Sequence, residues 1–203
     1  MDGVRQRDPR VPVLGTYTDA CRIEADGVDD LVRFLDQQSG TGRVVLTDKG
    51  RLSKFLQETV GDAVFNCRSG KLWSVEFKIE RKHTGNLFLE TWSNLDRRNP
   101  GWMVKLDADI LLYYFLDVPV LYAVNFQRLC KWAFGDSDEW TDGRQPSQSP
   151  GRIYTYPERR QNKYNQLNDT WGRCVNVDVL RRDVGMREYR RIGTGWSLME
   201  SSS

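Results

Sequence analysis

The chain has 203 residues, of which 39% are hydrophobic and 29% charged, and its formal net charge is +2. A chain of this size buries one sizeable core, so we expect one main domain rather than two. The longest apolar run, Ile110–Leu116, is too short to span a bilayer, and the charged first ten residues lack the apolar segment of a signal peptide. We therefore expect a soluble, cytoplasmic protein with no membrane partner.

The cysteines and the histidine restrict the possible chemistry. The four cysteines, at positions 21, 67, 130 and 174, stand too far apart to form a local zinc knuckle. His83 is the only histidine, so any Ser/His/Asp, Cys/His or multi-histidine site would have to include it. Catalysis in this chain would therefore depend on carboxylates and lysine.

Helical spacing dominates the first part of the chain. Residues 29–38 carry apolar side chains at helical intervals and are followed by a Gly-rich stop at 39–42. The apolar run Val44–Leu46 indicates a short strand or connector. Apolar residues then recur at helical spacing between Asp48 and Gly61, which predicts an amphipathic helix over about 49–59.

Strand patterns follow this helix. Residues 62–67 and 72–80 are rich in β-branched and aromatic residues and flank a turn at 68–71, a pattern typical of a β-hairpin. Residues 86–92 form a third candidate strand after a Thr-Gly loop. The order at this point is therefore helix, strand, strand, strand.

The next segments complete the core. The apolar residues of 106–116 cover most of a helical circumference and predict a buried helix. Residues 120–126 predict a strand and 127–134 a short helix, whereas 135–151 is polar and rich in Gly, Pro and Ser, as in a long loop. Residues 174–180 alternate in the manner of an edge strand.

This pattern divides the chain into three parts. We expect a core with an N-terminal extension over 1–135, a linker or loop over 136–151, and a C-terminal appendage over 152–203 that packs on the core. From Gly151 onward the chain has ten Lys and Arg against six Asp and Glu, together with several tyrosines and tryptophans. This local positive excess suits phosphate binding, and it is also typical of a solvated surface.

One group of residues carries the chemistry. Asp62 opens the first strand of the predicted hairpin, and Glu76 and Lys78 lie on its partner strand. The side-chain period of two places Glu76 and Lys78 on the same face of that strand and Phe77 on the other. Two carboxylates brought together in this way suit Mg²⁺ or Mn²⁺, which prefer hard oxygen ligands.

Asp62 followed by Glu76-Phe77-Lys78, within the order of elements from about 49 to 134, resembles the PD-(D/E)XK nuclease superfamily. The resemblance implies an α/β fold with a mixed sheet and a restriction-endonuclease-like helix, strand, strand, strand, helix, strand core. It implies a metal-dependent nuclease that hydrolyses nucleic acid, with DNA favoured over RNA, and a possible homodimer. Asp62, Glu76 and the Phe77 carbonyl would hold the metal, and Lys78 would steer the attacking water.

Further residues are candidates for the same site. The resemblance implies an additional glutamate on the preceding helix, which would be Glu58. Glu90, on the third strand, either completes the metal shell or faces outward. Trp92 and Trp102 either stack on bases or lie in the core. Five basic residues could contact phosphate by virtue of their charge, without a specific motif: Arg81, Lys82, Arg159, Arg160 and Lys163.

Three alternatives stay open at this point. The chain could be a catalytically inactive nucleic-acid-binding module of the same fold, with its aromatic and basic tail making the contacts. It could be a protein-interaction module in which the Glu-x-Lys alternation is only a solvated strand face. A glycosidase based on paired carboxylates is the third alternative.

Overall fold

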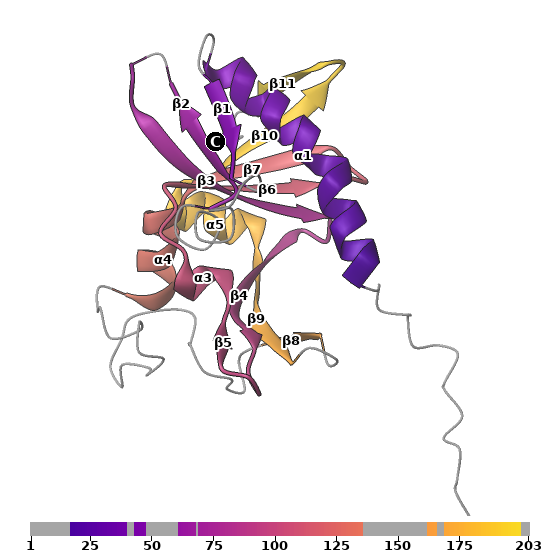
Figure 1. The fold of residues 1–203 in the computed structure, drawn as a ribbon, viewed down its shortest axis with the longest axis vertical. Helices are drawn as coiled ribbons and strands as arrows, with labels where there is room; N and C mark the ends of the chain where they lie inside the picture. Colours follow the sequence, from indigo (N-terminus) through magenta and orange to yellow (C-terminus); the bar gives the residue numbers. More distant parts are fainter. Residues whose placement is uncertain are drawn as a thin grey trace, which may run out of the picture.

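The computed structural model describes residues 17–39, 43–47, 61–67, 69–135, 162–165 and 169–199. These residues form a mixed α/β structure with a large seven-stranded sheet, a second sheet of four strands and four helices (Figure 1). The predicted helix over 49–59, with Glu58, lies outside the described residues. None of the described helices is long and apolar enough to cross a membrane.

The main sheet has the strand order β1-β2-β3-β6-β7-β10-β11. Strands β3 and β6 are parallel, and every other neighbouring pair is antiparallel. The mixed sheet of the prediction is therefore confirmed. Its strands are β1 (Arg43–Leu46), β2 (Ala63–Asn66), β3 (Leu72–Glu80), β6 (Ile110–Phe115), β7 (Val120–Asn125), β10 (Arg187–Ile192) and β11 (Gly195–Leu198).

The second sheet has the order β5-β4-β9-β8; β4 and β5 come between β3 and β6 in the chain, whereas β8 and β9 follow α4. Figure 1 shows it projecting away from the main sheet, with β5 and β8 at its far end. We call this four-stranded sheet the arm. Its strands are β4 (Asn86–Asn94), β5 (Asn99–Pro100), β8 (Asn162–Asn165) and β9 (Thr170–Asn176).

Helices cover both faces of the main sheet. On one face, helix α1 (Tyr17–Ser39) buries Leu31, Phe34 and Leu35 against a cluster that includes Val75 and Phe77 of β3. On the other face lie α3 (Trp102–Lys105), α4 (Phe126–Phe134) and α5 (Val177–Val184). Because side chains alternate along a strand, the even-numbered residues of β3 point to this second face.

The predicted helix over 106–116 is wrong, because strand β6 occupies 110–115, and the short helix α3 ends at Lys105, before this segment begins. Strand β6 lies in the interior of the sheet between β3 and β7, with buried residues on both of its faces. A strand covered on both sides shows a continuous apolar run, which periodicity does not distinguish from a buried helix.

The C-terminal part of the chain contributes strands to both sheets. Strand β9 pairs with β4 in the arm, and β10 pairs with β7 in the main sheet. These residues thus extend the sheets rather than form an appendage on a finished core. The predicted strand over 174–180 ends at Asn176, because the Asn176 side chain accepts a hydrogen bond from the Asp178 N–H and caps α5.

The other predicted elements are confirmed with small shifts. The hairpin strands are β2 and β3, the third strand is β4, and the strand over 120–126 and the helix over 127–134 are β7 and α4. The helix predicted over 29–38 is the C-terminal part of the longer α1. The restriction-endonuclease-like core itself stays a prediction.

The pairing of β4 with β9 depends on Gly172. A Cβ atom at this position would lie 2.4 Å from the Leu89 carbonyl oxygen and 2.8 Å from the Glu90 Cα, both backbone atoms. We expect Gly172→Ala to lower the free energy of unfolding by about 1–3 kcal/mol through overpacking. Gly195→Ala is the control, since its nearest atom is the Gln37 Oε1 at 3.5 Å. Equal urea midpoints for the two variants would contradict this prediction.

Candidate active site

Asp62 is fixed against β3 by two backbone hydrogen bonds. Its N–H donates to the Val75 carbonyl at 2.9 Å, and its Oδ2 accepts from the Phe77 N–H at 2.8 Å. Ala63 pairs with Val75 in the antiparallel register, so Asp62 lies beside Glu76. The structure therefore brings the two predicted carboxylates together at the start of the hairpin.

The residue before Asp62 makes this approach possible. Gly61 has a φ of +101°, and a Cβ there would lie 2.8 Å from the Val75 carbonyl oxygen. Thr47, at the end of β1, donates its hydroxyl to the Gly61 carbonyl at 2.6 Å and its N–H to the Asp62 carbonyl at 2.9 Å. Asp62 is thus held between β1 and β3, and a side chain at position 61 would displace it.

Glu76 and Lys78 form an ion pair on the face of β3 that α3, α4 and α5 cover. The Lys78 Nζ lies 2.5 Å from a Glu76 carboxylate oxygen, and Glu76 is only 4% exposed. Burial raises the pKa of Glu76 to about 7, with the charge of Lys78 opposing this shift and that of Asp62 adding to it. Burial disfavours the charged form of Lys78, but the carboxylates of Glu76 and Asp62 outweigh that effect and raise its pKa.

The arm and α3 contribute three more residues. Burial raises the pKa of Glu90, on β4, and the nearby charges of Lys78 and Lys105 and the Trp102 N–H oppose the shift. The Lys78 Nζ lies 5.5 Å from the centre of the Trp102 ring. Glu90 therefore belongs to the cluster instead of facing outward. Trp102 was considered as a base-stacking or core residue, but Lys105 was not predicted, because only the long-range packing of α3 on β4 brings it to β3.

The donors present fit a hard divalent cation in kind. Asp62 and Glu76 supply adjacent carboxylates, and their mutual repulsion is one cause of the raised pKa of Glu76. A divalent cation between them would relieve that repulsion. Within the described ranges, no group of three or more His, Cys, Asp or Glu side chains is placed to hold a metal ion. The set would thus be two carboxylates and the Phe77 carbonyl, with water completing the shell.

The other candidate residues are exposed, are buried in the core, or fall outside the described residues. Arg81 and Lys82 are exposed beyond the end of β3. Arg159 and Arg160 fall outside the described residues, and only the backbone of Lys163, on β8, is described. Trp92 and Trp102 are buried, 8% and 5% exposed, as in the core interpretation.

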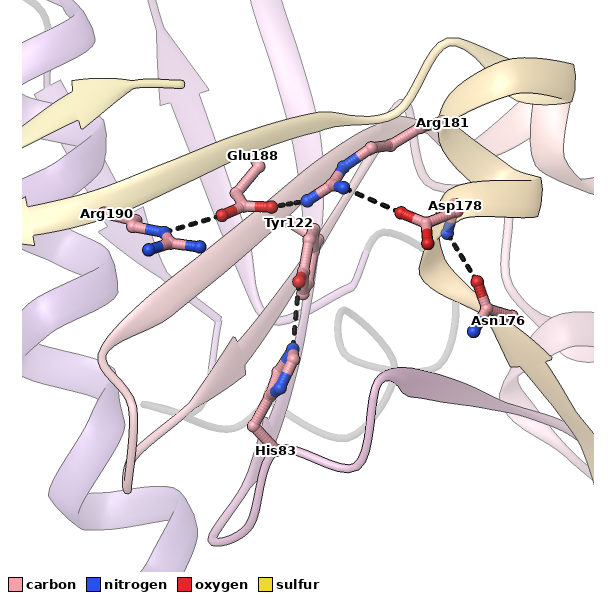
Figure 2. A network of polar contacts seen from close by, with 7 residues as sticks. All are labelled: His83, Tyr122, Asn176, Asp178, Arg181, Glu188 and Arg190. Carbon is pink, nitrogen blue, oxygen red and sulfur yellow. Dashed lines mark hydrogen bonds and ion pairs between the residues drawn. The ribbon is translucent and has the colours of Figure 1, made fainter. Parts of the chain in front are cut away.

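His83 belongs to a separate polar network, shown in Figure 2. Its Nε2 is 2.9 Å from the Tyr122 hydroxyl, and the Arg181 guanidinium lies 5.7 Å from the Tyr122 ring centre. Arg181 forms an ion pair with the buried Glu188, which also accepts a hydrogen bond from Arg190 at 2.8 Å. His83 thus ties the β3–β4 connection to β7, β10 and α5, which is a structural role.

Glu80 joins β3 to the base of the arm. The Tyr113 hydroxyl donates a short hydrogen bond to the Glu80 Oε1 and accepts one from the Phe88 N–H at 3.2 Å. Burial raises the pKa of Glu80, and the hydrogen bond from Tyr113 opposes the shift. One tyrosine therefore connects β3, β6 and β4.

No protein-family model, curated protein or solved structure matches this chain. The interpretation of the cluster accordingly depends on its own geometry and chemistry.

The Glu76–Lys78 pair can be tested by its contribution to stability. We expect Lys78→Met to lower the free energy of unfolding by about 2–3 kcal/mol, because it leaves the buried Glu76 carboxylate without its ion-pair partner. The double variant Glu76→Gln with Lys78→Met should recover most of this loss. Urea denaturation measures both, with Lys82→Met, an exposed lysine, expected to stay within about 0.5 kcal/mol of wild type. Additive losses in the double variant would contradict the pairing.

Glu80 predicts a pH dependence of stability. Because its pKa in the folded protein is raised above the ordinary value of 4.5, its charged form disfavours folding. Its stabilising contribution is complete below pH 4.5 and is lost as the pH rises through the raised pKa. In Glu80→Gln this part of the pH dependence should disappear, which thermal denaturation across this pH range measures. An unchanged pH profile would show that burial of Glu80 does not affect its ionisation.

Proposed function

We propose that the protein is a metal-dependent nuclease of the PD-(D/E)XK kind that hydrolyses phosphodiester bonds, with DNA as the favoured substrate. The observation that carries this proposal is the convergence of Asp62, Glu76 and Lys78 at one point of the β2–β3 hairpin. Two carboxylates and an ammonium group, next to a strand carbonyl, form the set that metal-assisted phosphodiester hydrolysis requires.

The order of elements supports the proposal. Helix α1 is followed by the antiparallel strands β1, β2 and β3, then by α3 and by β6, which is parallel to β3. The prediction placed this order on other residues: its first helix, 49–59, lies outside the described residues, its third strand is β4 of the arm, and its second helix is strand β6. What the described residues share with it is a helix, an antiparallel hairpin and a later strand parallel to β3. The arm strands β4 and β5 stand between β3 and α3 in the chain.

Asp62, Glu76 and the Phe77 carbonyl would hold Mg²⁺ or Mn²⁺, which when bound supplies polarisation of the phosphate and a lower pKa for water. Lys78 lies beside these carboxylates and is charged, so its ammonium group can orient the attacking water and stabilise the negative charge that develops on the phosphate oxygens. Lys105 adds a second positive charge near Glu76 and Glu90. The buried ring of Trp102 lies next to Lys78 and provides an apolar neighbour for its ammonium group.

One observation favours an inactive nucleic-acid-binding or protein-interaction module as the alternative. Glu76 and Lys78 neutralise each other in the described structure, and the described residues hold no group of three metal-binding side chains. A module of this kind would bind without cutting.

The nuclease proposal includes a homodimer, which would bring together two sites for cutting both strands of a duplex.

Cleavage of labelled duplex DNA, single-stranded DNA and RNA, with Mg²⁺, Mn²⁺ or EDTA, tests the proposal. We expect metal-dependent cutting by the wild type and a loss on the order of 100-fold or more in Asp62→Asn and Lys78→Met, because each removes a group that acts on the reacting phosphate. Lys71→Met is the matched control, since Lys71 is exposed at the far turn of the same hairpin.

Circular dichroism and thermal melting establish that each variant is folded. Cutting by Asp62→Asn at the wild-type rate would refute the assignment of the site. Binding of nucleic acid by the folded wild type, without cutting under any metal condition, would favour the inactive module.

A further inference from the structure

The far end of the arm carries two adjacent arginines on an unusual turn. Residues 95–98 form the turn between β4 and β5, and Arg97 and Arg98 are both exposed. Arg98 has a φ of +55°, and Asp169, which faces this turn from the start of β9, has a φ of +50°. Among the described residues these two are the only non-glycine residues with positive φ.

Hydrogen bonds hold this turn in one conformation. The Asp169 carbonyl accepts from the Leu95 N–H at 3.0 Å, and its Oδ2 accepts from the Asp96 N–H at 3.1 Å. The Asp169 Oδ1 accepts from the Trp171 Nε1 at 2.9 Å, so the carboxylate is itself anchored to β9. The Asn94 Oδ1 accepts from the Arg97 N–H at 2.8 Å. The two arginines are therefore presented by a fixed backbone.

The guanidinium groups of Arg97 and Arg98 form no ion pair with a carboxylate in the part of the chain that the structure describes. In contrast, Arg181, Arg190 and Arg191 each contact an acidic side chain. Left-handed backbone is unfavourable for arginine and is better tolerated by glycine or asparagine. An arginine in this conformation, with no ion-pair partner among the described residues, points to a partner outside the chain.

Phosphodiester oxygens are the partner that this arrangement fits. Two neighbouring guanidinium groups offer planar, fixed sets of donors, which match phosphate geometry better than a flexible ammonium group does. Contacts of this kind position a nucleic acid without reading its sequence. A rigid turn serves this purpose, because little conformational entropy is lost on binding.

The arm also sets the distance between these arginines and the candidate active site. Glu90, which is near Lys78, lies on β4, and β4 leads directly into the turn. At roughly 3.3 Å per strand residue, Arg97 and Arg98 lie on the order of 15–20 Å from Glu90. A strand of duplex DNA advances about 3.4 Å per nucleotide, so this span corresponds to about four to six nucleotides.

We propose that the turn at 95–98 binds the phosphodiester backbone of the substrate through Arg97 and Arg98, about four to six nucleotides from the bond that is cut. This inference rests on the proposed nuclease function and adds the position of a second contact. Figure 1 shows β5, which directly follows the turn, at the end of the arm remote from the main sheet.

Fluorescence anisotropy with labelled duplex DNA, single-stranded DNA and RNA in EDTA tests this contact. The variants are Arg97→Ala, Arg98→Asn and the two combined; asparagine tolerates the left-handed conformation, so folding should be retained and the thermal midpoint should not fall. For the double variant we expect affinity lower on the order of tenfold and a salt dependence whose log–log slope is shallower by about two. Arg33→Ala, on α1 and 62% exposed, is the matched control and should bind as wild type does.

Substrate length provides a second measurement. With Mg²⁺, the double variant should cut long substrates more slowly than wild type and should cut equally well substrates too short to reach the turn. Equal affinity and equal salt slope of double variant and wild type would overturn this inference and leave the nuclease proposal standing. Failure of the wild type to bind any of the three nucleic acids would overturn both. The nucleic acid that loses affinity in the double variant identifies whether the contacted backbone is DNA or RNA.

Discussion

The buried carboxylate of Glu76 is the constraint on which the candidate site depends. A carboxylate that is 4% exposed on an interior strand is stable only if nearby groups compensate for its lost hydration. Lys78 does so through a direct ion pair, and Lys105 through its nearby charge. The position of Lys105 depends on α3, and α3 depends on Gly101, where a Cβ would lie 2.5 Å from the Glu90 carbonyl oxygen. The packing of α3 against the arm therefore also determines how the charge of Glu76 is compensated.

Polar residues continue beyond the site on the face of the main sheet that α3, α4 and α5 cover. The register pairs Lys78 with Tyr113, Tyr113 with Tyr122, and Tyr122 with Glu188, so one row crosses β3, β6, β7 and β10. Each tyrosine in the row uses its hydroxyl group, Tyr113 with Glu80 and Tyr122 with His83. Satisfied polar groups of this kind favour one register over a shifted one, because a one-residue slip would bury each of them against α1.

Local patterns predicted the hairpin and the placement of Asp62, Glu76 and Lys78 on it, whereas they could not predict which distant strands pair. The alternation around Glu76 and Lys78 is visible in the sequence because a strand with one polar face repeats every two residues. Strand β6 lacks that signal, because both of its faces are buried. Strand β10 is rich in arginine and pairs with β7 across more than sixty residues of sequence, so neither its place in the sheet nor the ion pairs of Glu188 follow from its composition.

The charge balance of the candidate site is consistent with the anionic substrate that we propose. The cluster holds the carboxyl groups of Asp62, Glu76 and Glu90 and the ammonium groups of Lys78 and Lys105, so when all are ionised it has one negative charge in excess. One divalent cation would convert this to a single positive charge, which one phosphodiester group would neutralise. Uncompensated charge is costly in a partly buried site. The negative site without metal would therefore favour binding of the cation, and the positive site with metal would favour binding of the phosphodiester group. The balance supports phosphodiester chemistry over hydrolysis of a neutral sugar polymer, for which two carboxyl groups would suffice without Lys78 and Lys105.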